Sequence, residues 1–202
     1  MIAWSSALFA LLLAAQAAGA FTPLFRGTLD GWSIQGTSAG NFSLRDRVLH
    51  VEGPDGWLRS DRQYGDFTLR ADFRFLTDDA DSGIYVRAVG ATPFMRGWPN
   101  QSYQVQVRNP KGQSRFPPVG GLFRHGMPDG ELVFDVAAAA RLSKPTGEWQ
   151  TIEVDAIADR LTVRLNGTEL SRAGNIVNAR GYVGIQAEVG ALEFRSIEIR
   201  ER

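Results

Sequence analysis

The chain alternates apolar and polar residues with a period of two, and this pattern constrains its fold more than any other feature. In residues 67–75, Phe, Leu, Ala, Phe and Phe alternate with Thr, Arg, Asp and Arg. Successive side chains of a strand point to opposite faces, so one face of such a segment covers a core. Similar alternation recurs in residues 152–156, 161–165 and 183–187. The sequence therefore predicts an all-β fold.

Turn-forming residues separate these segments, because the chain holds 22 glycines and 9 prolines and includes the tight-turn dipeptide at 166–167. Many short strands of this kind are typical of a sandwich or a barrel. The helical signal is confined to the alanine-rich residues 137–142, before Pro145. We expect at most one short helix, within a long loop. The apolar phase changes once in residues 192–199, which predicts a bulge near residues 195–196.

The first twenty residues differ in composition from the remainder. They carry no charged side chain, contain a short apolar stretch and end in Ala-Gly-Ala, which is typical of a secretory signal peptide. We expect residues 1–20 to be this leader, and residues 21–202 to form a single β-sandwich domain. The mature protein is then exported, to the periplasm or the extracellular space. An uncleaved N-terminal anchor is the alternative.

Composition argues against several classes of protein. The 22 basic and 22 acidic residues balance without a basic cluster, so we expect no nucleic-acid partner. Past the leader there is no apolar segment long enough to span a bilayer, and we expect no membrane span. Cysteine is absent, which excludes disulfides and thiolate metal sites. The two histidines, His50 and His125, have no partner at a metal-ligand spacing, so we assign no metal ligands.

Two predicted strands carry polar side chains on the face opposite the core. Alternation puts Tyr85 and Arg87 on one such face, and Gln104 and Gln106 on another. Amides offer donors and acceptors to a ligand rich in hydroxyls, while a guanidinium suits sugar oxygens or a developing oxyanion. We predict that Tyr85, Gln104 and Gln106 bind substrate and that Arg87 is catalytic. A structural ion pair is the alternative for Arg87, and a solvated sheet face is the alternative for the amides.

Three titratable residues are further catalytic candidates. Asp81 and Glu188 could act as bases or as metal ligands, and His125, in a long loop, could act as an acid or a base. The structural alternatives are a turn carboxylate, an ordinary surface charge and a loop histidine without a chemical role.

Other side chains suit a sugar ligand. Gln186 shares a face with Glu188 by alternation and adds an amide, so we predict that it binds substrate. Trp98, Phe94 and Phe116 lie in predicted loops, where aromatic rings can stack on a sugar. Of these, Trp98 is our predicted substrate-binding residue.

Six segments, in the right order, resemble the 3-keto-disaccharide hydrolase domain family of exported bacterial proteins. They are residues 24–32, 64–69, 82–87, 103–107, 144–150, and 184–186 together with 193–197. The resemblance covers nearly all of residues 21–202. It implies a concanavalin A-like lectin/glucanase fold, which is a two-sheet antiparallel jelly-roll sandwich.

The family pattern also shows where this chain departs from it. The family commonly has Asn at position 81, Glu at 104 and His near 188, whereas this chain has Asp81, Gln104 and Glu188. Arg87 and Gln106 match the pattern, as does Gln186. A change from Glu to Gln removes a proton acceptor and a potential metal ligand. The resemblance therefore implies conserved binding groups and altered acid–base groups.

The resemblance implies a hydrolase that acts on a 3-keto-glycoside, such as a 3-keto-disaccharide. A C3 ketone acidifies the C2 proton, so a base can remove it, the C1 substituent leaves and water adds. We assign Arg87, with Gln106, to the C3 oxygen, and Asp81 or Glu188 to the base, with His125 as a further candidate. No cofactor is certain, and a divalent metal stays open.

The expected ligand is a saccharide, and a sugar 3-dehydrogenase is the expected functional partner. Two alternatives come from other classes of protein. One is a non-catalytic carbohydrate-binding module on the same sandwich, which Gln104 favours. The other is an envelope interaction or scaffold domain without affinity for sugars.

Overall fold

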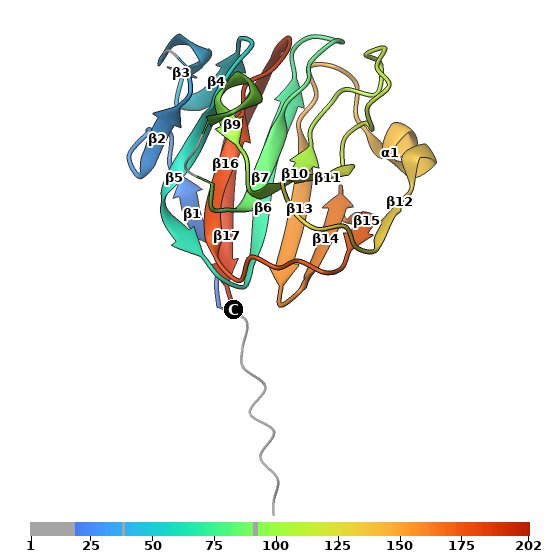
Figure 1. The fold of residues 1–202 in the computed structure, drawn as a ribbon. Helices are drawn as coiled ribbons and strands as arrows, with labels where there is room; N and C mark the ends of the chain where they lie inside the picture. The colour runs from blue at the N-terminus through green and yellow to red at the C-terminus, as the bar shows by residue number, and fades with distance from the viewer. Residues whose placement is uncertain (1–18, 38, 91–92) are drawn as a thin grey trace, which may run out of the picture.

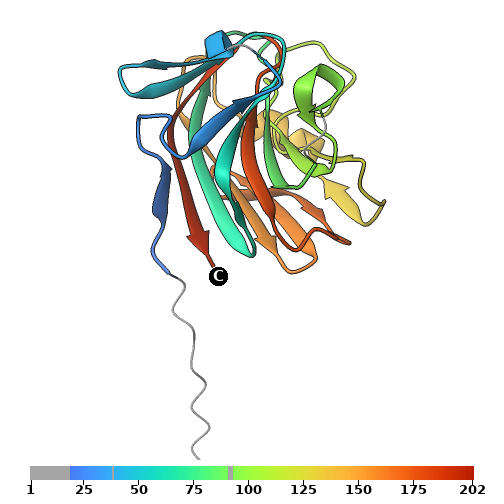
Figure 2. The same ribbon diagram turned by 60° about the vertical axis from the view of Figure 1, so that its left-hand side comes forward.

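The computed structural model describes residues 19–37, 39–90 and 93–202. The predicted leader lies outside the described residues except for its last two positions. Two antiparallel sheets lie face to face as two layers (Figures 1 and 2). No helix in the described part of the chain is long and apolar enough to cross a membrane.

The larger sheet has nine strands, in the order β12-β15-β14-β13-β6-β17-β4-β3, with β1 paired to β17. Its strands are β1 (Thr22–Phe25), β3 (Phe42–Arg45), β4 (Val48–Glu52), β6 (Phe67–Phe75), β12 (Leu132–Phe134), β13 (Gln150–Ile157), β14 (Arg160–Leu165), β15 (Thr168–Ala173) and β17 (Ala191–Glu201).

The smaller sheet has six strands, in the order β11-β10-β7-β16-β5-β2. Its strands are β2 (Trp32–Gln35), β5 (Trp57–Tyr64), β7 (Gly83–Ala88), β10 (Ser102–Gln106), β11 (Leu122–His125) and β16 (Gly181–Gln186). A two-stranded ribbon, β8 (Pro93–Phe94) with β9 (Trp98–Pro99), lies in front of this sheet (Figure 1). The short 3-10 turns are η1 (Ala39–Asn41) and η2 (Met95–Gly97).

The core lies between the two sheets, where the alternating apolar residues meet. In β6 the inward residues, Phe67 to Phe75 at every second position, are no more than 1% exposed. Ile84 and Val105 of the smaller sheet belong to the same buried cluster. Each large apolar side chain buried in this way contributes about 1.5–3 kcal/mol to folding.

The predicted local features agree with the structure. Asn166 and Gly167 both have positive φ angles, 50° and 83°, at the tight turn between β14 and β15. The register of β17 against β6 shifts between Phe194 and Ser196, which is the predicted bulge. The single α-helix of the described residues is α1 (Val136–Leu142), where Asp135 Oδ1 accepts a 2.8 Å hydrogen bond from the Ala138 amide. The all-β, two-sheet prediction is therefore confirmed.

Candidate functional site

A hollow opens on the outer face of the six-stranded sheet, opposite the core. Its cavity volume is about 180 Å³, which is below the range of roughly 300–1,000 Å³ typical of small-molecule sites. Its lining comes from β10, β11, the end of β16, the β8–β9 ribbon and the loop before β11. The lining residues are Trp98, Gln104, Gln106, Phe116, Phe123, His125, Gln186 and Glu188.

The sheet register brings the amides to the floor of this hollow. Gln104 lies opposite Tyr85 of β7, and Gln106 lies opposite Gly83, so their side chains share a face. Gly83 leaves room for them, because a Cβ atom there would lie 2.4 Å from Gln104 Nε2. Gln186 reaches the same floor from the end of β16 on the far side of β7.

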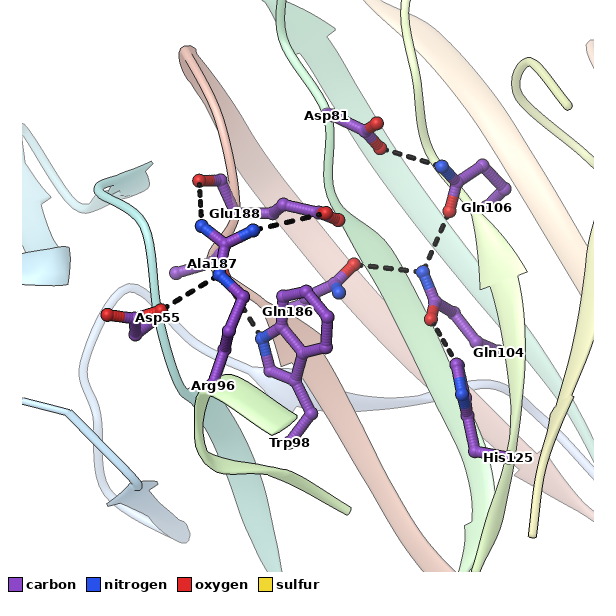
Figure 3. A network of polar contacts seen from close by, with 10 residues as sticks. All are labelled: Asp55, Asp81, Arg96, Trp98, Gln104, Gln106, His125, Gln186, Ala187 and Glu188. Atoms are coloured by element: carbon purple, nitrogen blue, oxygen red, sulfur yellow. Dashed lines mark hydrogen bonds and ion pairs between the residues drawn. The ribbon is translucent and has the colours of Figure 1, made fainter. Parts of the chain in front are cut away.

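The floor amides form one directional chain of hydrogen bonds (Figure 3). Gln106 Nε2 donates to Asp81 Oδ1 at 2.7 Å, which turns Gln106 Oε1 toward Gln104. Gln104 Nε2 donates to Gln106 Oε1 at 2.7 Å and to Gln186 Oε1 at 2.9 Å. Gln104 Oε1 is then left to accept from His125 Nε2 at 2.6 Å, so His125 carries a proton on Nε2. Burial lowers the pKa of His125 and favours its neutral ring.

The chain ends at a pair of carboxyl groups, Asp81 and Glu188. Antiparallel backbone hydrogen bonds join Asp81 to Val189, at 2.8 and 3.1 Å, and so hold the two acidic residues near each other. Burial, and then the charge of Glu188, raise the pKa of Asp81 to about 7. Burial also raises the pKa of Glu188, against the opposing effect of Arg96. Asp81 can therefore exchange a proton at neutral pH.

Arg96 supplies the positive charge beside this pair, and the sequence analysis did not identify it. Its Nη1 lies 3.5 Å from Glu188 Oε1, its Nε lies 3.0 Å from Asp55 Oδ1, and its guanidinium carbon lies 5.0 Å from the centre of the Trp98 ring (Figure 3). Trp98 Nε1 donates to the Ala187 carbonyl at 3.3 Å. Nothing in the loop sequence signals that Arg96 folds back onto Glu188.

Close backbone contact holds the Arg96 loop in place. Gly36 and Gly97 approach so closely that a Cβ atom on Gly36 would lie 2.4 Å from the carbonyl oxygen of Gly97. The Gly56 amide donates to the Arg96 carbonyl at 2.8 Å. Arg96 itself has a left-handed backbone, with φ 61°. Arg96 and Trp98 are therefore positioned by the turns next to β2 and β5. These two strands lie at the other end of the six-stranded sheet from β10 and β11.

Tyr85 lies beside Gln104 on the same face of the sheet but does not line the hollow. Its ring packs edge-on against Trp57 and His125, with centroids 5.6 and 6.0 Å apart. The residue is fully buried, and its hydroxyl has no hydrogen-bond partner among the described residues. Tyr85 thus supports His125 and does not reach a ligand, contrary to its predicted substrate-binding role.

Arg87 corrects the sequence analysis. Its guanidinium points between the sheets, where Nη2 donates to Asp66 Oδ1 at 2.9 Å and to the Ala156 carbonyl at 3.1 Å. The cause is the left-handed backbone of Arg87, with φ 51°, where β7 and β16 lose register. The predicted catalytic contact of Arg87 is wrong, and the structural ion pair is the correct interpretation.

The other candidates come together around the hollow. Gln104, Gln106, Gln186, His125, Trp98 and Glu188 line it, and Asp81 joins it through Gln106. Phe116 lies on its wall, whereas the side chain of Phe94 lies outside the described residues. Phe123 was missed, although its two-residue spacing from His125 in one short strand could have indicated a shared face.

The residues present do not fit a divalent metal held by carboxylates and imidazoles. No group of three or more histidine, aspartate or glutamate side chains that could hold a metal occurs among the described residues. The remaining residues, 1–18, 38 and 91–92, contain none of these residue types.

Comparison with known proteins gives a family match and several structural matches. The model of the 3-keto-alpha-glucoside-1,2-lyase-like domain family matches residues 20–200. Among curated proteins, none matches the chain.

Several solved structures share the fold. A proposed glycosyl hydrolase of Parabacteroides distasonis is 18% identical, with a TM-score of 0.71, over 91% of this chain and 100% of that one. The carbohydrate-binding module CBM66 of Bacillus subtilis is 11% identical, with a TM-score of 0.58, over 85% and 96%. A β-glucanase of Bacillus licheniformis is 14% identical, with a TM-score of 0.53, over 91% and 99%. These likenesses bear out the jelly-roll lectin/glucanase sandwich.

Proposed function

The chain belongs to the 3-keto-alpha-glucoside-1,2-lyase-like domain family, and from this premise we propose that it cleaves 3-keto-glycosides by elimination followed by hydration. The observation that carries the proposal is Asp81. It is a buried carboxyl with a pKa of about 7, fixed by Gln106 beside a hollow with an amide floor.

In this proposal Asp81 is the base that removes the C2 proton. The C3 ketone delocalises the resulting negative charge, so a base with a pKa near 7 suffices at neutral pH. Gln106 Nε2 holds the Oδ1 atom of Asp81, so we assign the proton to the other oxygen. As the C1–C2 double bond forms, the bond from C1 to the leaving oxygen breaks.

Gln186 takes the role that the sequence analysis assigned to Arg87. Gln186 Oε1 accepts from Gln104, whereas its Nε2 has no hydrogen-bond partner among the described residues (Figure 3). Because Gln186 lines the hollow, this free amide can donate to the C3 oxygen as negative charge develops there.

Hydration completes the reaction. Water adds its oxygen to C1 and loses a proton to the Glu188 carboxylate, while Asp81 returns the abstracted proton to C2. We assign Glu188 to the proton that the leaving oxygen requires, because burial raises its pKa and the backbone hydrogen bonds between Asp81 and Val189 hold its side chain near Asp81. Arg96 limits that rise through its contact with Glu188.

The cellular context is part of the proposal. The apolar residues 1–20 support export to the periplasm or the extracellular space. A sugar 3-dehydrogenase would supply the 3-keto substrate.

The test is turnover of a 3-keto-glucoside by purified residues 21–202 and by Asp81→Asn. The amide is isosteric and cannot take the C2 proton, so we expect kcat to fall by about 10²–10⁴-fold with unchanged substrate affinity. Glu153→Gln, on the far sheet, is the matched acid-to-amide control. Equal rates for Asp81→Asn and the wild type would rule out Asp81 as the base.

A carbohydrate-binding module is the second candidate. Gln104, an amide where the family commonly has Glu, supports it, as does the likeness to CBM66. Saccharide binding without product release from any 3-keto-glycoside would decide for this function.

A further inference from the structure

One wall of the hollow is a ladder of aromatic rings that leads from the floor to the surface. The rings of His125 and Phe123 are stacked, with centroids 6.0 Å apart and planes 23° apart. Phe116 continues the ladder edge-on, with its centroid 6.1 Å from that of Phe123. Phe116 is 45% exposed, so part of its ring faces solvent.

Hydrogen-bonding groups are concentrated at the floor. Among the lining residues, Gln104, Gln106, Gln186 and Glu188 belong to the floor and to the carboxyl pair, and His125 is tied to Gln104. Phe116 and Phe123 offer only ring faces and edges. The hollow therefore divides into an end that offers hydrogen-bonding groups and an end that offers aromatic surface, where the Arg115 guanidinium carbon lies 5.1 Å from the centre of the Phe116 ring.

We propose that the aromatic wall holds the leaving group and that this group is a flat aromatic ring, so that the substrates are 3-keto-glycosides of aromatic alcohols. The proposal rests on the proposed function and names its substrate class. A sugar ring bound at the floor directs its C1 substituent out of the hollow, and Phe116 and Phe123 line that exit. A flat aromatic ring matches these ring faces and edges better than a second sugar, whose hydroxyls would find few hydrogen-bonding partners among the phenyl rings.

The chemistry of elimination favours the same substrates. A phenol has a pKa near 10, as in tyrosine, so a phenolate leaves C1 more readily than the alkoxide of a second sugar. Cleavage then needs less proton donation at the leaving oxygen. This suits a hollow in which Glu188, tied to Arg96, is the second acid beside Asp81.

The experiment measures binding separately from turnover. Phenyl and methyl glucosides of both anomers, which lack the 3-ketone and do not react, are titrated calorimetrically into residues 21–202 alongside a glucosyl-glucose disaccharide. We expect the phenyl glucoside to bind about three- to tenfold more tightly than the methyl glucoside. Phe116→Ala should abolish this preference without changing affinity for the methyl glucoside.

Leu132→Ala is the matched control, because Leu132 is 49% exposed and lies outside the hollow. It should keep the preference. Turnover of the corresponding 3-keto-glucosides should show the same order of kcat/KM values.

The outcomes separate this inference from the proposed function. If the phenyl and methyl glucosides bind equally and 3-keto-glucosides are still turned over, the aromatic leaving group is overturned and the activity stands. The same holds if the disaccharide binds most tightly and loses its advantage in Phe116→Ala. If no glucoside binds and none is turned over, both proposals are overturned.

Discussion

The outer faces of the two sheets differ in how they satisfy their polar side chains. On the nine-stranded sheet, charged residues of neighbouring strands pair with one another in a ladder. The ion pairs include Arg70 with Glu153 at 3.0 Å, Arg164 with Asp155 at 2.6 Å, Arg74 with Glu193 at 2.7 Å and Arg195 with Asp72 at 3.2 Å. On the six-stranded sheet the groups are amides, and their chain ends beside a hollow at the free Nε2 of Gln186.

This difference between the two outer faces indicates where a ligand can bind. Cross-strand ion pairs use their donors and acceptors on each other, so they stabilise the sheet modestly and leave nothing for a ligand. The amide floor is also internally bonded, but it keeps one donor next to open space. A buried polar network with a spare group beside a cavity is therefore a better sign of function than the presence of charge.

The largest effect is expected at Arg87, which alternation assigns to the ligand-binding face and the structure turns into the interior. Arg87→Met removes the donors to Asp66 and to the Ala156 carbonyl. We expect unfolding free energy to fall by about 2–4 kcal/mol, as measured by urea denaturation. Arg164→Met, in the partly exposed ladder, is the control and should cost about 1 kcal/mol or less. If Arg87→Met unfolds at the same urea concentration as the wild type but loses affinity for sugars, Arg87 has a ligand-binding role and not a structural one.

The second-largest effect is expected when a carboxyl group and an amide group are exchanged on the outer face of each sheet. Gln104→Glu removes the donors to Gln106 and Gln186 and sets a carboxylate against two amide oxygens. We expect kcat/KM to fall by about 100-fold because Asp81 and Gln186 lose their orientation, a size comparable to the loss of one oriented donor.

The reverse exchange on the other face is the control for this variant. Glu153→Gln weakens one ion pair with Arg70 and should change neither kcat/KM nor stability by more than about 1 kcal/mol. Higher activity of Gln104→Glu than of the wild type would contradict the orienting role of the floor amides.

The smallest effect is expected in the pH dependence of catalysis and of stability, through Asp81. Asp81 must be ionised to act as a base and has a pKa of about 7, so kcat/KM should rise with pH on the acid side of the profile. It should fall again at higher pH, where Glu188, the proposed proton donor, loses its proton. Because the pKa of Asp81 is raised in the folded protein, its contribution to stability is lost as pH rises from about 4 to 7. Asp81→Asn should therefore gain stability relative to the wild type over that interval, as followed by thermal unfolding. A flat pH–rate profile across pH 5–8 would contradict this assignment.

Sequence analysis predicted a side chain's position where the residue type itself indicates which face of the strand it occupies. The bulge near Ser196 was predictable because apolar residues on both sides of it must face the core. The bulge at Arg87 was not, because a charged residue gives no sign that it enters the interior. It was predictable that Gln104 and Gln106 share a face. Their meeting with Gln186 was not, because it depends on the strand order β10-β7-β16.

Residues that come from connections were the least predictable. Arg96 reaches Glu188 only because the ribbon of β8 and β9 folds over the sheet, and no periodicity describes such a path. His125 lies in a short strand, β11, within a segment that the sequence analysis treated as a loop. The family resemblance indicated the fold, but the roles of Asp81 and Gln104 could be assigned only from the structure.

The contact between Gly36 and Gly97 gives this protein a way to change ligand preference without altering any residue in the hollow. A methyl group at position 36 would push the opposing turn away and carry Trp98 with it, so the width of the mouth depends on a residue more than sixty positions earlier in the chain. A residue with a Cβ at position 36 is strained, because the φ angle there is 70°. A relative that tolerates one would combine the same chemistry at the floor with a different range of accepted glycosides.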